Sequence, residues 1–254
     1  MSSIKSPDDI KHLREGGKRL SAVLDVLEKK VAPGVSTKEL DLLGEKLIKQ
    51  GGDTPAFLDY QPAGASYPYP ATVCISVNDE IVHGIPSDRV LEEGDIVGLD
   101  IGLSHNGLIV DMARTVAVGK VSKEIQKLLK DTKAALAAGI KAAKPGARVG
   151  DISAAIENIG KKEGYGIVRD LGGHGVGHAV HELPFVPNYG KAGTGPKLEE
   201  GMVLALEPMF NLGGDDVTLD ADDYTYRTED GSYSAHFEHT IVITSKGAEI
   251  VTSS

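Results

Sequence analysis

Histidines and carboxylates interrupt the apolar segments of this sequence at several places. The segment "GGHGVGHAVHELP" (172–184) carries His174, His178 and His181 among four glycines. A four-residue spacing lets two histidines of a helix bind one zinc ion, but each interior glycine costs a helix about 1 kcal/mol. On an extended chain, which rises about 3.3 Å per residue, His174 and His178 lie roughly 13 Å apart. At most one of these two histidines therefore serves a given metal ion, and the other ligands must come from elsewhere in the chain.

Asp100 and Asp111 are candidates for those ligands. They lie in "DIVGLDIGLSHNGLIVDMARTVAV", which predicts a β-hairpin because Asn106-Gly107 is a strong two-residue turn signal. With the turn at these two residues, position 102 pairs with Asp111, and Asp100 lies on the same face about 7 Å away. Two inward carboxylates among apolar residues repel each other unless a cation lies between them. Exposed strand aspartates are the alternative interpretation of this segment.

Glu207 and Glu238 strengthen the case for a metal. Glu207 ends the apolar run "MVLALE", and Glu238 lies within "AHFEHTIVI". Buried charges are expected to be paired or metal-bound, and four carboxylates in apolar strands are hard to explain otherwise. Oxygen-rich ligand sets with one imidazole suit Mn, Fe, Co or Zn. Bridging carboxylates would make a two-metal site, with the ions about 3.5–4 Å apart.

The elements that would position these groups occur twice along the chain. A capped amphipathic helix is predicted after Ser6 and again after Ser122, each ending at a Pro-Gly pair and followed by a second helix closed by glycine. Two strand segments also correspond, with Asp111 opposite Glu238, and "LEEGDIVGLD" and "LEEGMVLALE" each end their strand in a carboxylate. We therefore expect one α+β domain over 1–254, made of two pseudo-twofold halves (about 1–120 and 121–254). Helices would lie outside, antiparallel strands inside, and one site between the halves.

The amino-acid composition limits the classes of function that this protein can have. The hydrophobic content of 41% and charged content of 25% are typical of a soluble globular protein, and a single cysteine fits a reducing compartment. The sequence contains no secretion signal and no apolar run of membrane-spanning length, so a cytoplasmic protein without membrane contact is expected. The net charge of −10 argues against DNA and broad nucleic-acid binding. Asp79 and Glu80 are interpreted as solvated loop charges, and so is the acidic loop 213–232, for which a specific protein or cation contact is the alternative.

Five residues then carry a family resemblance: Asp100, Asp111, His174, Glu207 and Glu238. Together with "CISVNDEIVHGIP", "GGHGVGHAVHELP", "EPM" and "EHTIVIT" they resemble the methionine aminopeptidases of the pita-bread fold. The resemblance runs from "IKSPDDIKHLREGG" to the end of the sequence. With neither the zinc-finger extension of eukaryotic type I enzymes nor the long insertion of type II, the chain is similar to the short bacterial type I form.

The resemblance implies roles for the residues. His174 would be the one histidine ligand, Asp100 a ligand of one metal ion, and Asp111 and Glu238 the bridges between two ions. Glu207 would bind the second ion and carry the proton of the attacking water. The two ions would be divalent, with Co, Mn, Fe, Zn and Ni all admissible.

The resemblance also implies which residues contact the substrate. His181 would contact the scissile amide, His83 would be its counterpart in the first half, and His178 would have no functional role. Cys74 and Tyr69 would line the methionine pocket, although a lone buried cysteine is more often plain core. Family members often have Trp where Tyr224 stands and an aromatic where Val180 stands, which leaves the shape of this pocket open.

The implied activity is removal of the N-terminal methionine from nascent polypeptides when the second residue is small. The protein would act as a monomer and contact the ribosome transiently at most, since the acidic loop 213–232 would repel RNA. One rival is an Xaa-Pro aminopeptidase or prolidase, which shares the fold and ligand set but usually carries a separate N-terminal domain. The other is a non-catalytic binding protein of the same fold, a class that loses ligands.

Overall fold

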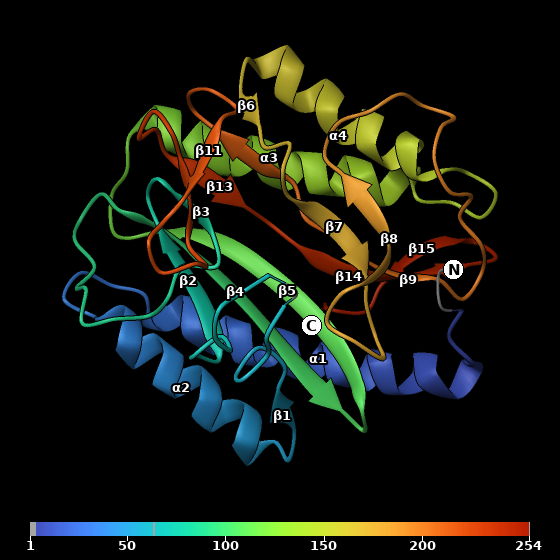
Figure 1. Ribbon diagram of the computed structural model, residues 1–254, viewed down its shortest axis with the longest axis horizontal. Helices are drawn as coiled ribbons and strands as arrows, with labels where there is room; N and C mark the ends of the chain where they lie inside the picture. Colours follow the sequence, from blue (N-terminus) through green and yellow to red (C-terminus); the bar gives the residue numbers. More distant parts are fainter. Residues whose placement is uncertain (1–3, 63, 254) are drawn as a thin grey trace.

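Two pairs of helices lie on opposite sides of the strands (Figure 1). The computed structural model describes residues 4–62 and 64–253. The helices of this part are α1 (Pro7–Lys30) and α2 (Thr37–Gln50), which form one pair, and α3 (Lys123–Ala142) and α4 (Val149–Glu163), which form the other. Among the described residues, no helix combines the length and the apolar character that crossing a membrane requires.

The helix ends follow from local sequence. The Ser6 side chain accepts a hydrogen bond from the backbone N–H of Asp9, and the Asp9 carboxylate accepts one from the Ser6 N–H. This reciprocal pair satisfies backbone donors that a helix start leaves unpaired. Ser122 caps α3 through the Ile125 N–H, and α4 ends at Gly164 in the left-handed conformation. The predicted helices and their caps are confirmed.

The strands form two principal antiparallel sheets, one in each half, and two smaller ones. One principal sheet has the order β1-β4-β2, with β5 also paired to β4, and the other has the order β15-β14-β9-β7-β8. The strands are β1 (Thr54–Pro55), β2 (Val73–Val77), β3 (Glu80–Val82), β4 (Ile96–His105), β5 (Leu108–Ala117), β6 (Gly166–Ile167), β7 (Gly172–Gly175), β8 (Glu182–Pro187), β9 (Val203–Leu206), β10 (Met209–Asn211), β11 (Val217–Leu219), β12 (Tyr226–Thr228), β13 (Ser234–His236), β14 (His239–Thr244) and β15 (Gly247–Ile250).

The hairpin of β4 and β5 has the predicted register. His105 pairs with Leu108 across the Asn106-Gly107 turn, and Gly102 pairs with Asp111. Asp100, however, lies in the middle of the ten-residue strand β4 rather than at its end. The strand continues because β5 and β2 pair with it on both sides of this residue. By contrast, Glu207 directly follows β9, as predicted.

The two halves share their interior. One apolar core packs α1 and α2 against β4 and β5, and a second packs α3 and α4 against the other principal sheet. The first core nevertheless includes Val203 and Val242 from strands of the second half. Burial of apolar surface therefore stabilises the two halves jointly.

Two threonine side chains hold β5 against the chain of the second half. The Thr240 hydroxyl accepts a hydrogen bond from the Asp111 N–H at 2.9 Å and donates to the Asp111 carbonyl at 2.8 Å. The Thr115 hydroxyl makes the same two bonds to the backbone of His236, at 2.9 and 2.8 Å. Between them, the Glu238 N–H donates to the Ala113 carbonyl at 2.9 Å. These bonds set Asp111 and Glu238 side by side.

Thr240→Val is expected to destabilise the protein by about 1–3 kcal/mol, because the buried N–H and C=O of Asp111 would lose their partner. Urea unfolding measures the change. Thr218→Val, on an exposed position of β11, is the matched control and should change stability by less than about 0.5 kcal/mol. Equal effects of the two substitutions would show that the Thr240 bonds do not hold the halves together.

Candidate metal centre

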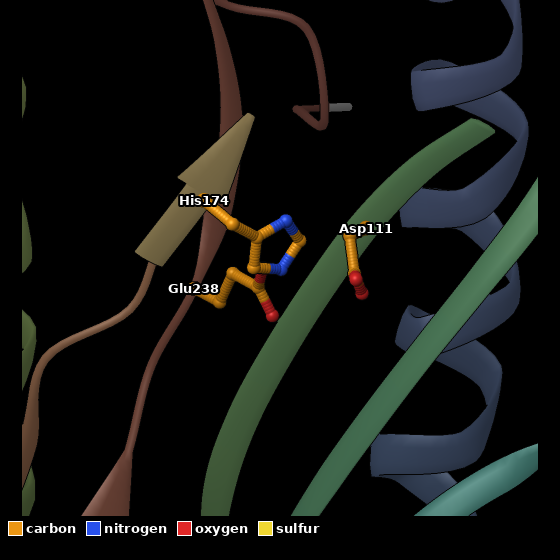
Figure 2. Close-up of side chains that lie close together, drawn as sticks. All are labelled: Asp111, His174 and Glu238. Atoms are coloured by element: carbon orange, nitrogen blue, oxygen red, sulfur yellow. The ribbon is translucent and has the colours of Figure 1, made fainter. Parts of the chain in front are cut away.

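Three donor side chains converge between the two halves. Asp111 comes from β5, His174 from β7, and Glu238 from the short link between β13 and β14. Figure 2 shows the three side chains pointing into one space, and one ligand atom of each lies within 4.8 Å of the others. All three residues are buried. This spacing is suited to a metal ion bound by one imidazole and two carboxylates.

Asp100 and Glu207 extend this group to the five predicted residues. Asp100 and Asp111 line the same cavity, so the two aspartates share a face as the hairpin predicted. Glu207 Oε1 lies 3.4 Å from His174 Nε2. All five residues line one cavity of about 400 Å³. The fold therefore brings together every residue that the sequence indicated as a ligand.

The carboxylates of this centre have raised pKa values. Burial and the neighbouring Asp111 and Glu207 charges raise the pKa of Asp100 and of Glu238 well above their usual values. Burial and the Asp111 charge do the same for Glu207, and burial raises the pKa of Asp111 to about 7. In the described part of the chain, the ion-pair partners of Glu207 and Glu238 are histidines. A concentration of negative charge without lysine or arginine is what divalent cations stabilise, so this donor set fits metal binding.

His174 is oriented to offer a nitrogen lone pair to the centre. Its Nδ1–H donates to the Gly175 carbonyl at 2.9 Å, which leaves Nε2 as the acceptor next to Glu207. Burial lowers the pKa of this imidazole to about 3, so it is neutral at pH 7. A neutral imidazole held by a backbone carbonyl is a common arrangement for a metal ligand.

The other two histidines of this glycine-rich segment differ in position. His181 lies on the cavity, with its ring centroid 4.5 Å from that of His174 and its Nδ1 hydrogen-bonded to the Tyr60 hydroxyl at 2.9 Å. His178 is exposed, does not line the cavity, and has Nε2 3.9 Å from Asp9. Because β7 ends at Gly175, the segment is a strand and a loop, and the predicted absence of a helix is confirmed.

An internal ion pair fixes the loop that carries His181. The Lys5 ammonium donates to Glu182 Oε2 at 2.6 Å, and the Lys5 side chain has no exposed surface. Glu182 Oε1 also accepts the backbone N–H groups of His178 and Ala179 at 2.7 and 3.2 Å. One carboxylate thereby ties both ends of the loop to the N-terminal segment. The sequence analysis did not identify this pair.

His83 and an apolar cluster complete the cavity. His83 lines the cavity, and burial together with the His181 charge lowers its pKa to about 4. Tyr69 and Cys74 pack in one buried cluster with Val180 and Tyr224, and all four line the cavity. The Tyr69 hydroxyl donates to the Gly84 carbonyl at 2.8 Å, so its ring faces the cluster without an unpaired polar group. The cavity therefore has a polar end of donors and an apolar end.

His236 is a further neighbour of the centre that the sequence analysis missed. Its Nε2 lies 3.7 Å from Glu207 Oε2 and 4.0 Å from Glu238 Oε2, and has no hydrogen-bond partner among the described residues. The available signal was its position two residues before Glu238, since alternate residues of an extended chain share a face.

The interpretation of Asp79 and Glu80 as solvated charges is wrong. Arg227, from the acidic loop, donates to Asp79 at 2.9 Å and to Glu80 at 2.7 Å. Glu80 also accepts the Val77 N–H, and its side chain is only 10% exposed. The acidic loop is likewise held by contacts, because Tyr67 donates to the Asp222 carbonyl at 2.5 Å. The single arginine of the acidic segment thus binds Asp220 of its own loop, at 2.6 Å, as well as the two carboxylates that are distant in sequence.

Residues 11–245 match metallopeptidase family M24, and the chain belongs to this family. The methionine aminopeptidase of Aquifex aeolicus is 45% identical to this chain over 250 residues, 97% of each chain. The crystal structure of methionine aminopeptidase from Rickettsia prowazekii covers 100% of both chains with a TM-score of 0.96 and 38% identity. An Xaa-Pro dipeptidase from Bacillus anthracis is 26% identical with a TM-score of 0.79, and the match covers 62% of that chain. These similarities confirm the pita-bread fold, and the family and the donor group together indicate divalent metal use.

The metal-free protein is expected to lose stability as the pH rises above 6.5. The pKa of Asp111 is about 7 in the folded state against a usual 3.8, so its stabilising contribution is complete below pH 3.8 and is lost as the pH rises through 7. His174 acts oppositely, because its pKa falls from 6.5 to about 3, but that contribution is already complete above pH 6.5.

Urea unfolding in EDTA at about pH 6.5 and pH 8 measures this loss. A divalent cation should remove it, because the cation replaces the protons between the carboxylates. Asp111→Asn combined with Glu238→Gln is the control, with a smaller pH dependence expected. A metal-free protein that gains stability over this interval would contradict the assignment of the raised pKa values.

Proposed function

We propose that this protein is a metal-dependent aminopeptidase that removes the N-terminal methionine from polypeptides whose second residue is small. The observation that carries the proposal is the cavity in which four carboxylates and the His174 imidazole adjoin an apolar cluster. The full-length similarity to the Aquifex and Rickettsia methionine aminopeptidases supports it. We further propose that residues 1–254 form one catalytic domain with the site between its two halves.

The centre would hold two divalent ions. Asp111 and Glu238, which the threonine hydrogen bonds set side by side, would bridge the ions, with Asp100 and Glu207 binding one ion each. His174 would be the imidazole ligand through Nε2. When bound, the ions would lower the pKa of a water molecule and hold the free α-amino group of the substrate.

Side chains of the protein would carry out the proton transfer and bind the scissile amide. Glu207 lines the cavity with Oε1 3.4 Å from His174 Nε2, and its carboxylate would accept a proton from the attacking water and pass it to the leaving amine. His181 and His83 line the same cavity and would donate hydrogen bonds to the carbonyl of the scissile amide. Tyr60 holds Nδ1 of His181 and thereby orients the ring.

The apolar end of the cavity would select the first side chain of the substrate. Tyr69 and Cys74, packed with Val180 and Tyr224, enclose a space that suits an unbranched thioether. The substrates would be N-termini of nascent polypeptides in the cytoplasm. The protein would act as a monomer, and its contact with the ribosome would be transient.

Hydrolysis of Met-Ala-Ser after EDTA treatment and metal restoration tests the proposal. Free methionine should appear with added Mn²⁺ or Co²⁺ and not with EDTA alone. Met-Leu-Ser should react much more slowly, and Ala-Pro-Ser should not react. Cleavage of Ala-Pro-Ser in preference to Met-Ala-Ser would assign the chain to the Xaa-Pro class, and metal binding without any cleavage would indicate a non-catalytic protein.

Substitutions of the three histidines in the glycine-rich segment should have different effects on metal binding and on turnover. His174→Ala is expected to weaken metal binding and abolish turnover, whereas His181→Ala should lower kcat by about 10²–10⁴-fold with metal binding unchanged. His178→Ala, at the exposed position outside the cavity, is the matched control and should change neither property. Metal titration and initial rates measure both. Equal loss of metal from the His174 and His181 variants would overturn these roles.

A further inference from the structure

A second hollow, named here the rear groove, lies between α3 and β15. This rear groove has a volume of about 510 Å³, within the range of sites that hold small molecules. Its floor is the chain on both sides of Glu238, which lines the metal cavity as well. It is lined by Ala113, Arg114, Lys133, Leu136, Ala137, Ile140, Lys141, Ala143, Lys144, Phe237, Glu238, His239, Lys246, Gly247, Ala248 and Ile250.

Positive charge surrounds the rear groove, although the protein carries a net charge of −10. The cations come from several elements: Lys133 and Lys141 from α3, Lys144 just after it, and Lys246 from the turn between β14 and β15. Within the described residues, none of these four lysines has a carboxylate within 4.0 Å, whereas Arg114 pairs with two carboxylates of α1. Glu238, already committed to the metal centre, is the one acidic residue among the described lining residues.

The walls between these lysines are apolar. Leu136 and Ile140 of α3 face Ala248 and Ile250 of β15, with Phe237 at the floor. Lysines whose only role is to keep a protein surface hydrated do not require an apolar hollow between them. A cationic rim around an apolar hollow is instead complementary to a ligand with an anionic head and an apolar body. The head would be attracted to the lysines of the rim, and the body would bury apolar surface in the hollow.

We propose that the rear groove binds a small amphipathic anion, whose carboxylate or phosphate head lies among Lys133, Lys141, Lys144 and Lys246 and whose apolar body lies against Phe237. The concave shape favours a small molecule over nucleic acid, which binds along extended rows of cations and needs no apolar hollow. This proposal rests on the groove itself and not on the proposed peptidase function.

Calorimetric titration of the full-length protein tests the proposal, with octanoate and octyl phosphate below their micelle concentrations as probes. Both should bind, and more weakly at high salt. Octanol and inorganic phosphate, which each lack one part of the ligand, should bind at least about tenfold more weakly. Octanoate and octyl phosphate distinguish a carboxylate from a phosphate head.

Two variants locate the binding. Lys133→Glu with Lys246→Glu reverses charge on opposite walls and should weaken both probes at least about tenfold. Lys11→Glu with Lys18→Glu, on exposed positions of α1, makes the same change in net charge and should have less than a twofold effect. Ala137→Trp fills the groove without changing charge and should weaken binding equally, with circular dichroism confirming the fold.

Three outcomes would overturn the proposal. The first is unchanged affinity in both the charge-reversed and the Ala137→Trp variants, which would place the probes elsewhere. The second is inorganic phosphate or an oligonucleotide binding as tightly as octyl phosphate, which would show that positive charge alone, without the apolar hollow, accounts for the binding. The third is no binding of either amphipathic probe.

Discussion

Repulsion between enclosed carboxylates is the constraint on which this structure depends. The four carboxylates of the metal centre line one cavity. Burial raises the pKa of all four, and neighbouring negative charge raises those of Asp100, Glu207 and Glu238 further. Ionised carboxylates at this spacing repel one another, so their own interactions do not keep them together. The backbone must hold them, and the hydrogen bonds of Thr240 and Thr115 join β5 to the chain around Glu238 for this purpose. The scaffold supplies in advance the geometry that a divalent ion then stabilises.

This constraint links the two halves of the chain. Asp111 belongs to the first half and Glu238 to the second, so either half alone carries only part of the donor set. The first apolar core also draws residues from the second sheet. The donor group therefore draws Asp111 from the first half and His174 and Glu238 from the second.

Local signals in the sequence predicted a large part of this arrangement. The Asn106-Gly107 turn determined which residues of the hairpin face each other, and capping serines located the helix starts. The contacts that escaped prediction join residues far apart in the chain. Tyr60 and His181 are separated by 121 positions, and Arg227 reaches Glu80 across 147. No periodicity or turn signal encodes such contacts, because they depend on how the loops pack once the sheets have formed. His236 escaped for a different reason: its position two residues before Glu238 was the available signal, but that spacing was not applied to it.

The Lys5–Glu182 ion pair bears on the order in which the protein becomes functional during its own synthesis. Lys5 is made before its partner Glu182, which follows 177 positions later. At about 5–20 residues per second the two are separated by roughly 9–35 s of translation. During that interval the lysine has no partner and the loop that will carry His181 does not exist. The helices and the first hairpin can form early from local contacts, but the cavity also needs Glu207 and Glu238, which follow Glu182 in the sequence. A partly made chain therefore holds no working peptidase.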